Sequence, residues 1–62
     1  MDKQEKLLTG NEVAQLLRIS RVHAYRLMRK GEIRCFRIGK VVRVRPRDLE
    51  KFIEKHMEQP TN

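Results

Sequence analysis

The side chains in this 62-residue chain that could do chemistry are mostly guanidinium and ammonium groups, gathered in one run. Residues 18–47 hold eleven of the fifteen lysines and arginines and one acidic residue, Glu32, for a net charge of +10. The remaining residues include four basic and seven acidic ones and sum to −3. Such a concentration of positive charge attracts polyanions, of which nucleic acid is the commonest. The competing interpretation is a basic surface that only keeps the protein hydrated.

No serine, cysteine, histidine or carboxylate stands in a pattern that predicts catalysis. The two histidines, His23 and His56, lack partners at metal-ligand spacing, and the lone Cys35 excludes an intramolecular disulfide and a multi-cysteine zinc site. We therefore expect no enzymatic activity, no metal and no cofactor. The single cysteine, the polar start and the lack of an apolar run of about 18 residues favour a cytoplasmic protein without signal peptide or membrane span.

A first helix is predicted after Thr9, because Thr9 and Glu12 form a T-x-x-E capping box. Leu8, which precedes the cap, and Val13 have the spacing of a hydrophobic staple. The apolar stripe expected to face the core consists of Val13, Leu16 and Leu17. This helix should end near Leu17.

A second helix over residues 21–30 is predicted after Ser20, a favoured N-cap residue. Gly31 supplies the left-handed conformation that often follows a helix end. The apolar side expected to pack on the first helix consists of Ala24, Leu27 and Met28. The opposite side presents Arg21, His23, Arg26 and Lys30. Two short helices joined by a three- to four-residue turn, with arginines on the second, are typical of a helix-turn-helix, whose second helix enters the DNA major groove.

Residues 34–38 and 41–45 interleave β-branched or aromatic residues with arginine and predict a β-hairpin with Gly39-Lys40 as its turn. The basic side chains expected along this wing are Arg37, Lys40, Arg43 and Arg45. They would contact mainly phosphate, whereas arginine forks on the second helix can pair with guanine. The alternation predicts that Arg37 and Arg43 face solvent or a ligand.

A third helix is predicted from Pro46, which suits the first helical position, with Asp48 in the first turn. The apolar stripe expected to close the core consists of Leu49, Phe52 and Ile53, continued by His56 or Met57. The predicted fold is mainly α with a small β-hairpin, a winged helix-turn-helix of order α-α-β-β-α. We expect a flexible tail over residues 1–6, the domain over 7–57 and a second flexible tail over 58–62.

With these elements the chain resembles the excisionase-family DNA-binding domain, within the wider MerR-like winged-helix group. The residues that carry the resemblance are Leu8-Thr9, Glu12-Val13-Ala14, Leu16-Leu17, Ser20-Arg21, Tyr25-Arg26-Leu27, Gly31-Glu32-Ile33, Arg37-Ile38-Gly39, Arg43-Val44 and Asp48-Leu49. The resemblance covers about residues 7–55. It implies sequence-specific DNA binding, with the second helix in the major groove and the wing in the minor groove.

By position, Ser20, Arg21 and Arg26 match the family's recognition helix, and Lys40 matches its wing tip. Tyr25 matches a tyrosine that often approaches a phosphate, although the residues alone also allow a core position for it. His23-Ala24 stands where the family usually has a small hydroxyl and a β-branched residue, and Val42 where an aromatic is frequent. For His23 the pattern is consistent with DNA contact or with plain solvent exposure.

The leading functional hypothesis is an excisionase-like factor that binds adjacent sites, bends the DNA and directs an integrase. The alternative is a small transcription regulator that acts by occupying a promoter. A third class is a role without DNA, in RNA binding or protein interaction. RNA binding is disfavoured because RNA readers usually stack bases on several aromatic residues, and the only ones here are Tyr25, Phe36 and Phe52. The expected partners are double-stranded DNA, further copies of the chain and an integrase, with no membrane and no small-molecule effector. The expected source is prokaryotic, or a phage or other mobile element.

Overall fold

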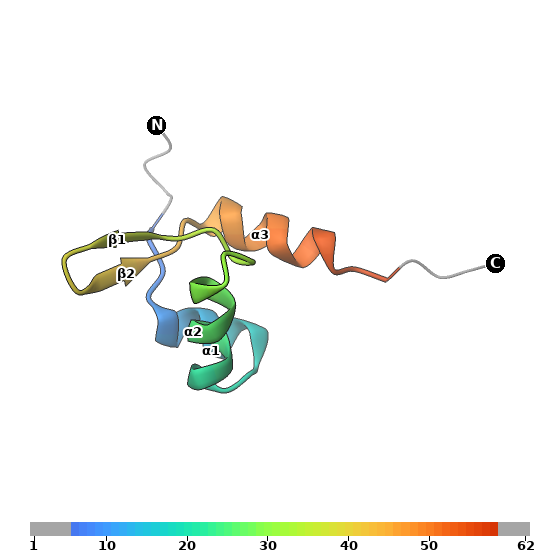
Figure 1. Cartoon of the computed structure of the whole chain (residues 1–62). Helices are drawn as coiled ribbons and strands as arrows, with labels where there is room; N and C mark the ends of the chain where they lie inside the picture. Colours follow the sequence, from blue (N-terminus) through green and yellow to red (C-terminus); the bar gives the residue numbers. More distant parts are fainter. Residues whose placement is uncertain (1–5, 59–62) are drawn as a thin grey trace.

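The computed structural model of the chain describes residues 6–58, in which three helices and two strands follow the order helix, helix, strand, strand, helix (Figure 1). The elements are α1 (Gly10–Leu17), α2 (Arg21–Arg29), β1 (Phe36–Ile38), β2 (Val41–Arg43) and α3 (Pro46–Lys55). The predicted winged helix-turn-helix order is confirmed. Of the predicted tails, only Lys6 and Glu58 are described, and the other tail residues lie outside this part of the chain. No helix within residues 6–58 is long and apolar enough to cross a membrane.

The start of α1 is fixed by the predicted capping box. The Glu12 backbone N–H donates to the Thr9 hydroxyl over 3.1 Å, and the Thr9 N–H donates to the Glu12 carboxylate over 2.9 Å. Val13 and Ala14 are buried, and Leu17 packs against the same core. The predicted stripe was wrong at Leu16, which is 61% exposed. The buried side of α1 is centred on Val13, Ala14 and Leu17, so it turns Leu16 outward.

The ends of α1 and α2 share one geometry. The Ile19 N–H donates to Ala14 and the Arg18 N–H to Gln15, the two bonds of a Schellman motif. The corresponding bonds after α2 run from Glu32 to Leu27 and from Gly31 to Met28. This motif requires a left-handed residue, which is Gly31 (φ 83°) after α2 but Arg18 (φ 58°) after α1. The glycine was predicted from sequence, whereas the strained arginine was not.

Helix α2 begins and packs as predicted. The Ser20 hydroxyl accepts from the His23 backbone N–H over 3.0 Å. Ala24 and Met28 are buried, and Leu27 is half-buried against the same core. Ile33, just beyond the left-handed glycine, is fully buried and extends this packing. The first two helices thus pack by their small and apolar sides and leave the opposite side of α2 in solvent.

The hairpin is joined to the helical pair through the segment that precedes α1. Strands β1 and β2 are antiparallel, and Ile38 opposite Val41 leaves Gly39-Lys40 as a two-residue turn with φ 60° at the glycine. Beyond β2, Val44 forms a bridge with Leu8: its N–H donates to the Leu8 carbonyl over 2.9 Å and its carbonyl accepts from Leu8 over 2.7 Å. Val44 is fully buried. The wing is therefore attached to the start of α1.

Helix α3 contacts the core through one side of its first two turns. Pro46 occupies the first turn as predicted, Leu49 is buried and Phe52 is half-buried against the core. Ile53 and Met57, predicted to continue the stripe, are exposed, and that part of the prediction was wrong. In Figure 1 the end of α3 extends away from the α1–α2 pair, and its side toward that pair carries Phe52 and His56, which line a groove with Leu27. The His56 ring instead stacks on Phe52, with ring centroids 4.3 Å apart.

Candidate nucleic-acid interface

The side of α2 that faces away from the core carries a continuous stripe of exposed residues. Because Ala24 and Met28 point inward, the helical period of 3.6 residues places the centre of the outer side at i, i+3, i+4 and i+7 from Val22. These residues are Val22, Tyr25, Arg26 and Arg29. Together with Arg21 they line a shallow groove of about 270 Å³. An arginine fork on such an open helix face can reach a base edge or a phosphate.

The structure separates the six residues predicted on the recognition helix into four places. Arg21, Tyr25 and Arg26 lie together in this groove. His23 lies on another side of α2, where it lines a second groove with Leu27 and Phe52. Ser20 caps the helix, and Lys30 follows the last helical residue and is exposed.

Sequence analysis missed Val22 and Arg29 in this groove. The prediction chose outward residues of α2 by their polarity. Counting the helical period outward from Ala24 and Met28 would have found both residues.

Tyr25 is both packed and exposed, so one of the alternatives left open by its sequence position, packing, is observed, and the phosphate contact stays a prediction. Its ring lies over Gly10, the first residue of α1, so closely that a Cβ atom at Gly10 would overlap it. About 38% of the residue remains accessible. Gly10 is thus needed for the close approach of the ring, and α1 fixes the direction in which the tyrosine points.

The two faces of the hairpin differ. Residues opposite each other share a face, so Arg37 lies with Val42, whereas Ile38 lies with Val41. Val42 packs on the core, while Ile38 is 67% exposed on the outer face. Arg37 and the turn residue Lys40 are exposed, as predicted for a wing. Arg43 is half-buried, and its Nη1 donates to the Val42 carbonyl over 2.9 Å, so it is held closer to the hairpin than predicted.

Arg45, the fourth predicted wing residue, forms an ion pair at the start of α3. Its Nε donates to the buried Asp48 carboxylate over 2.8 Å, and Nη2 to the other oxygen over 3.4 Å. The Arg45 guanidinium holds the pKa of Asp48 below its ordinary value, against the effect of burial, with further help from the charges of Arg34 and Lys51. A DNA contact by Arg45 would have to share a guanidinium already engaged by Asp48.

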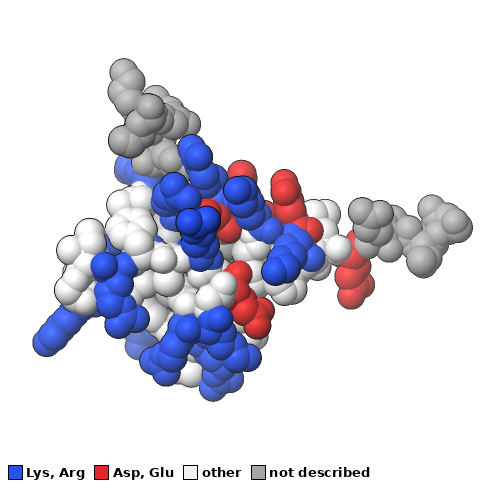
Figure 2. Space-filling model, turned by 45° about the horizontal axis from the view of Figure 1, so that its top comes forward, with Lys and Arg blue, Asp and Glu red and all other residues white. Residues whose placement is uncertain are grey.

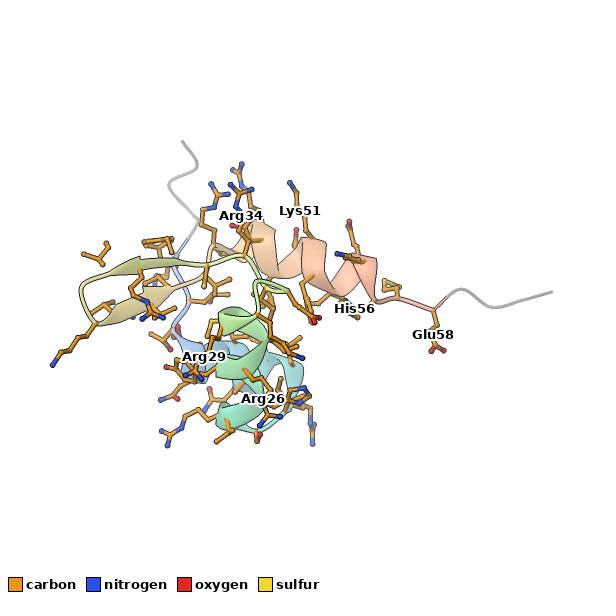
Figure 3. All side chains as sticks on the ribbon, viewed as in Figure 1. Arg26, Arg29, Arg34, Lys51, His56 and Glu58 are labelled. Carbon is orange, nitrogen blue, oxygen red and sulfur yellow. The ribbon has the colours of Figure 1, made fainter. Side chains whose placement is uncertain are left out.

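The positive charge that is continuous in the sequence is divided in space. Figure 2 shows lysine and arginine side chains in several groups, with acidic and uncharged surface between them. In Figure 3, Arg26 and Arg29 lie on α2 in the lower part of the view, while Arg34 and Lys51, the latter on α3, lie in the upper part. One of these groups surrounds Asp48 and is partly neutralised by it. The cations on α2 have no such carboxylate in their groove.

The turn between α1 and α2 contributes one further cation. Arg18 is exposed and lines a third open groove with Gln15 and Arg21. Its left-handed backbone is unfavourable for a residue with a Cβ atom. Arg18 was included in the basic run of the sequence, but its left-handed backbone conformation was not predicted. Helix ends usually have glycine or asparagine in this conformation, so an arginine does not indicate it.

The described residues hold no group of three or more histidine, cysteine, aspartate or glutamate side chains that could bind a metal ion. The His56 Nδ1 lies 2.9 Å from the Phe52 carbonyl, an acceptor, so the ring donates there and completes the end of α3. Cys35 is half-buried with its Sγ 3.8 Å from the Met28 carbonyl. Each contact joins a side chain to a backbone carbonyl.

Comparison with known proteins gives one family. Over residues 7–57 the chain matches the family described as helix-turn-helix domain, the excisionase-like family of such domains.

Three curated relatives are informative. "Putative DNA-binding protein Rv0500A" and "Putative DNA-binding protein MT0521", from two Mycobacterium tuberculosis strains (H37Rv and CDC 1551), are each 39% identical over 49 residues. The match covers 79% of this chain and 63% of each relative, so the chain spans less than two thirds of their length. "Uncharacterized protein YvgK" of Bacillus subtilis is 38% identical over 53 residues, or 84% of this chain and 17% of that protein. No solved structure matches the chain.

Proposed function

The chain belongs to the excisionase-like helix-turn-helix domain family, and from this premise we propose that it binds double-stranded DNA sequence-specifically. In this proposal α2 enters the major groove and the hairpin follows the backbone toward the neighbouring minor groove, as in MerR-like winged helices. The names of the mycobacterial relatives agree with a DNA ligand. Bacterial and phage DNA lies in the cytoplasm, where we place the activity of this protein.

The observation that carries the proposal is the outer side of α2. Its central stripe presents Arg26 and Arg29 to solvent, next to Tyr25, with no carboxylate among the residues lining the groove. A helix with its side chains is about as wide as the major groove of B-DNA. The guanidinium of Arg26 can then pair with O6 and N7 of a guanine, while cations on the turn and wing contact phosphate.

Replacing Arg26 tests this role directly. Arg26→Ala should cost about 1–3 kcal/mol of discrimination at one base pair and relax the preference there. Arg26→Lys is the matched control, because it keeps the charge but loses the planar fork. It should preserve the salt dependence of binding yet also lose the preference. If both variants retain the wild-type preference at every position, Arg26 does not read a base.

The finer function that we propose is that of an architectural factor in site-specific recombination. In this view several copies bind adjacent sites, bend the DNA and favour one direction of an integrase. Bending a site by about 40–90° costs of order 1–6 kcal/mol, which contacts between neighbouring copies must offset. The exposed outer face of the hairpin, with Ile38 and Val41, supports contact with a further copy, because apolar side chains gathered on one face favour association.

Bending and site arrangement can be measured together. Selected sites should occur as closely spaced repeats beside a recombination core, and binding should lower the end-to-end distance of doubly labelled DNA in energy-transfer experiments. Ile38→Ser should reduce cooperative filling of adjacent sites without changing affinity for one site. Single isolated sites at promoters, bound without bending, would instead favour a transcription regulator of the same fold.

A further inference from the structure

Val22 is the most exposed large apolar residue within residues 6–58, at 68%. Packing in the core does not explain why a valine stands at this position. It is absent from the core and from the residues packed against the core. Helix propensity does not account for it either, because a β-branched residue is less favourable in a helix than alanine. Its position, in the first turn of α2 directly after Arg21, is where a recognition helix contacts base edges.

The residues around Val22, and its own lack of polar atoms, limit which chemical groups of DNA it can contact. It lines the α2 groove with three arginines and Tyr25, all of which can donate hydrogen bonds to DNA. Val22 can neither donate nor accept a hydrogen bond. Among the groups that A·T, T·A, G·C and C·G pairs expose in the major groove, the apolar one is the 5-methyl of thymine. The aliphatic stem of Arg26, one helical turn further on, can form the second side of an apolar contact.

We propose that Val22 forms a binding site for the 5-methyl group of one thymine in the DNA target. This inference rests on the proposed function, since it requires α2 to lie in the major groove. The two γ-methyl groups of Val22 exclude water from the thymine methyl, while Arg26 reads a neighbouring base. A 5-methylcytosine presents its methyl group at the same place in the groove, so that base should be accepted there better than cytosine.

The experiment compares duplexes that differ by single methyl groups. Each thymine of the selected site is replaced in turn by deoxyuridine, which removes the 5-methyl and leaves every hydrogen-bonding group in place. One replacement should weaken binding of the wild-type protein about fourfold, the effect of one buried methyl group. Val22→Ala should bind the thymine and deoxyuridine forms of that duplex equally, which closes a double-mutant cycle.

Two controls distinguish the contact from a general defect. Met57→Ala also removes an exposed apolar side chain, 65% accessible, but beyond the end of α3, and should repeat the wild-type pattern. Val22→Ala does not disturb the core and improves helix propensity, so its thermal unfolding should match or exceed that of wild type. Val22→Thr keeps the shape and one methyl and should retain part of the preference.

The outcomes separate this inference from the proposed function. Specific binding that no deoxyuridine replacement weakens would overturn the methyl site and leave the reading role of α2 intact. A deoxyuridine effect that persists in Val22→Ala would assign the methyl contact to another residue and overturn the role of Val22. Binding without any sequence preference would refute the reading role of α2 itself, and the methyl site with it.

Discussion

Asp48 engages the guanidinium of Arg45, one of the four basic residues predicted on the wing, in an ion pair. Its carboxylate is buried at the start of α3 and accepts from both Nε and Nη2 of Arg45. Negative charge in the first turn of a helix is also favourable to the helix dipole. Since this buried acid has its guanidinium partner in place, we expect the pair to stabilise the junction between the hairpin and α3 rather than to add free charge for DNA.

Replacing Asp48 by asparagine should destabilise the fold in a pH-dependent way. Because Arg45 holds the pKa of Asp48 below 3.8, the stabilisation is fully present above that value and is lost as pH falls through the lower pKa of the folded protein. Near neutral pH, Asp48→Asn should lower the free energy of unfolding by roughly 1–2 kcal/mol. In urea unfolding at several pH values, this difference from wild type should shrink in acid.

Glu50→Gln is the control for this prediction, because Glu50 is an exposed acid on the same helix. It should change stability little at any pH. A difference between wild type and Asp48→Asn that stays constant from neutral pH to strong acid would mean that the Arg45–Asp48 pair does not provide the stabilisation.

At the level of elements, the ends of α1 and α2 form a natural comparison. Both use the same Schellman bonds, but one places glycine and the other Arg18 in the left-handed position. The left-handed conformation costs roughly 1–2 kcal/mol for a residue with a Cβ atom. A glycine would fit this backbone better, so we expect the charge of Arg18 to be what the arginine contributes at this turn.

Arg18→Gly should therefore raise stability and weaken DNA binding in the same protein. The expected gain is about 1 kcal/mol in the free energy of unfolding. Affinity for all DNA sequences should fall alike, with the salt slope lowered by about 0.9 for one lost phosphate contact. Gly31→Ala, at the equivalent position of α2, should lose about 1 kcal/mol. An Arg18→Gly protein with wild-type salt dependence would exclude a phosphate contact at the turn.

The position of Lys40 in the wing leads to a prediction about DNA binding and stability. Lys40 lies exposed in the hairpin turn, far from the core, so its removal should leave stability unchanged. Lys40→Ala should weaken binding to all sequences similarly and lower the salt slope by about 0.9. Lys55→Ala, which removes an exposed cation at the end of α3, should have a smaller effect on both. Equal effects of the two substitutions would argue that the wing acts only through net charge.

Features set by local chemistry and the centre of each helix's apolar side could be predicted from sequence, whereas the exposure of residues at the margins of those sides could not. The Thr9–Glu12 box, the Ser20 cap and the glycine turn positions each depend on neighbouring residues, and all were predicted. The exposure of Leu16 and Ile53 depends on how the helices meet, and periodicity alone placed both in the core. The bridge between Leu8 and Val44 joins residues 36 positions apart, so the residues next to either one do not predict it.

The candidate site divides in the same way. Three of the predicted residues share one groove: Arg21, Tyr25 and Arg26. Their polar side chains, on which the prediction relied, also lie on the exposed side of the helix. Val22 was missed because an apolar residue in a basic helix was not considered for contact with DNA. Engagement of Arg45 by Asp48 could not be foreseen, since a three-residue spacing permits the pair without requiring it.

For the whole molecule, the arrangement of charge is more informative than its total. Basic side chains of the described residues gather in the α2 groove, at the turn, on the wing and around Asp48. The first of these combines three arginines with Tyr25 and Val22 on one helix and has no carboxylate among its lining residues. If α2 reads DNA as proposed, one short helix covers few base pairs, and we expect high specificity to come from several copies on repeated sites.

Selection of bound sequences from random DNA at about 150 mM salt, a concentration that screens non-specific attraction, tests the central claim most directly. Enrichment of a short motif, containing a guanine whose preference is lost in Arg26→Ala, is the predicted result. Binding that falls steeply with salt but enriches no sequence would contradict it. In that case the basic surface would be real, and the assignment of α2 as a sequence-reading helix would be wrong.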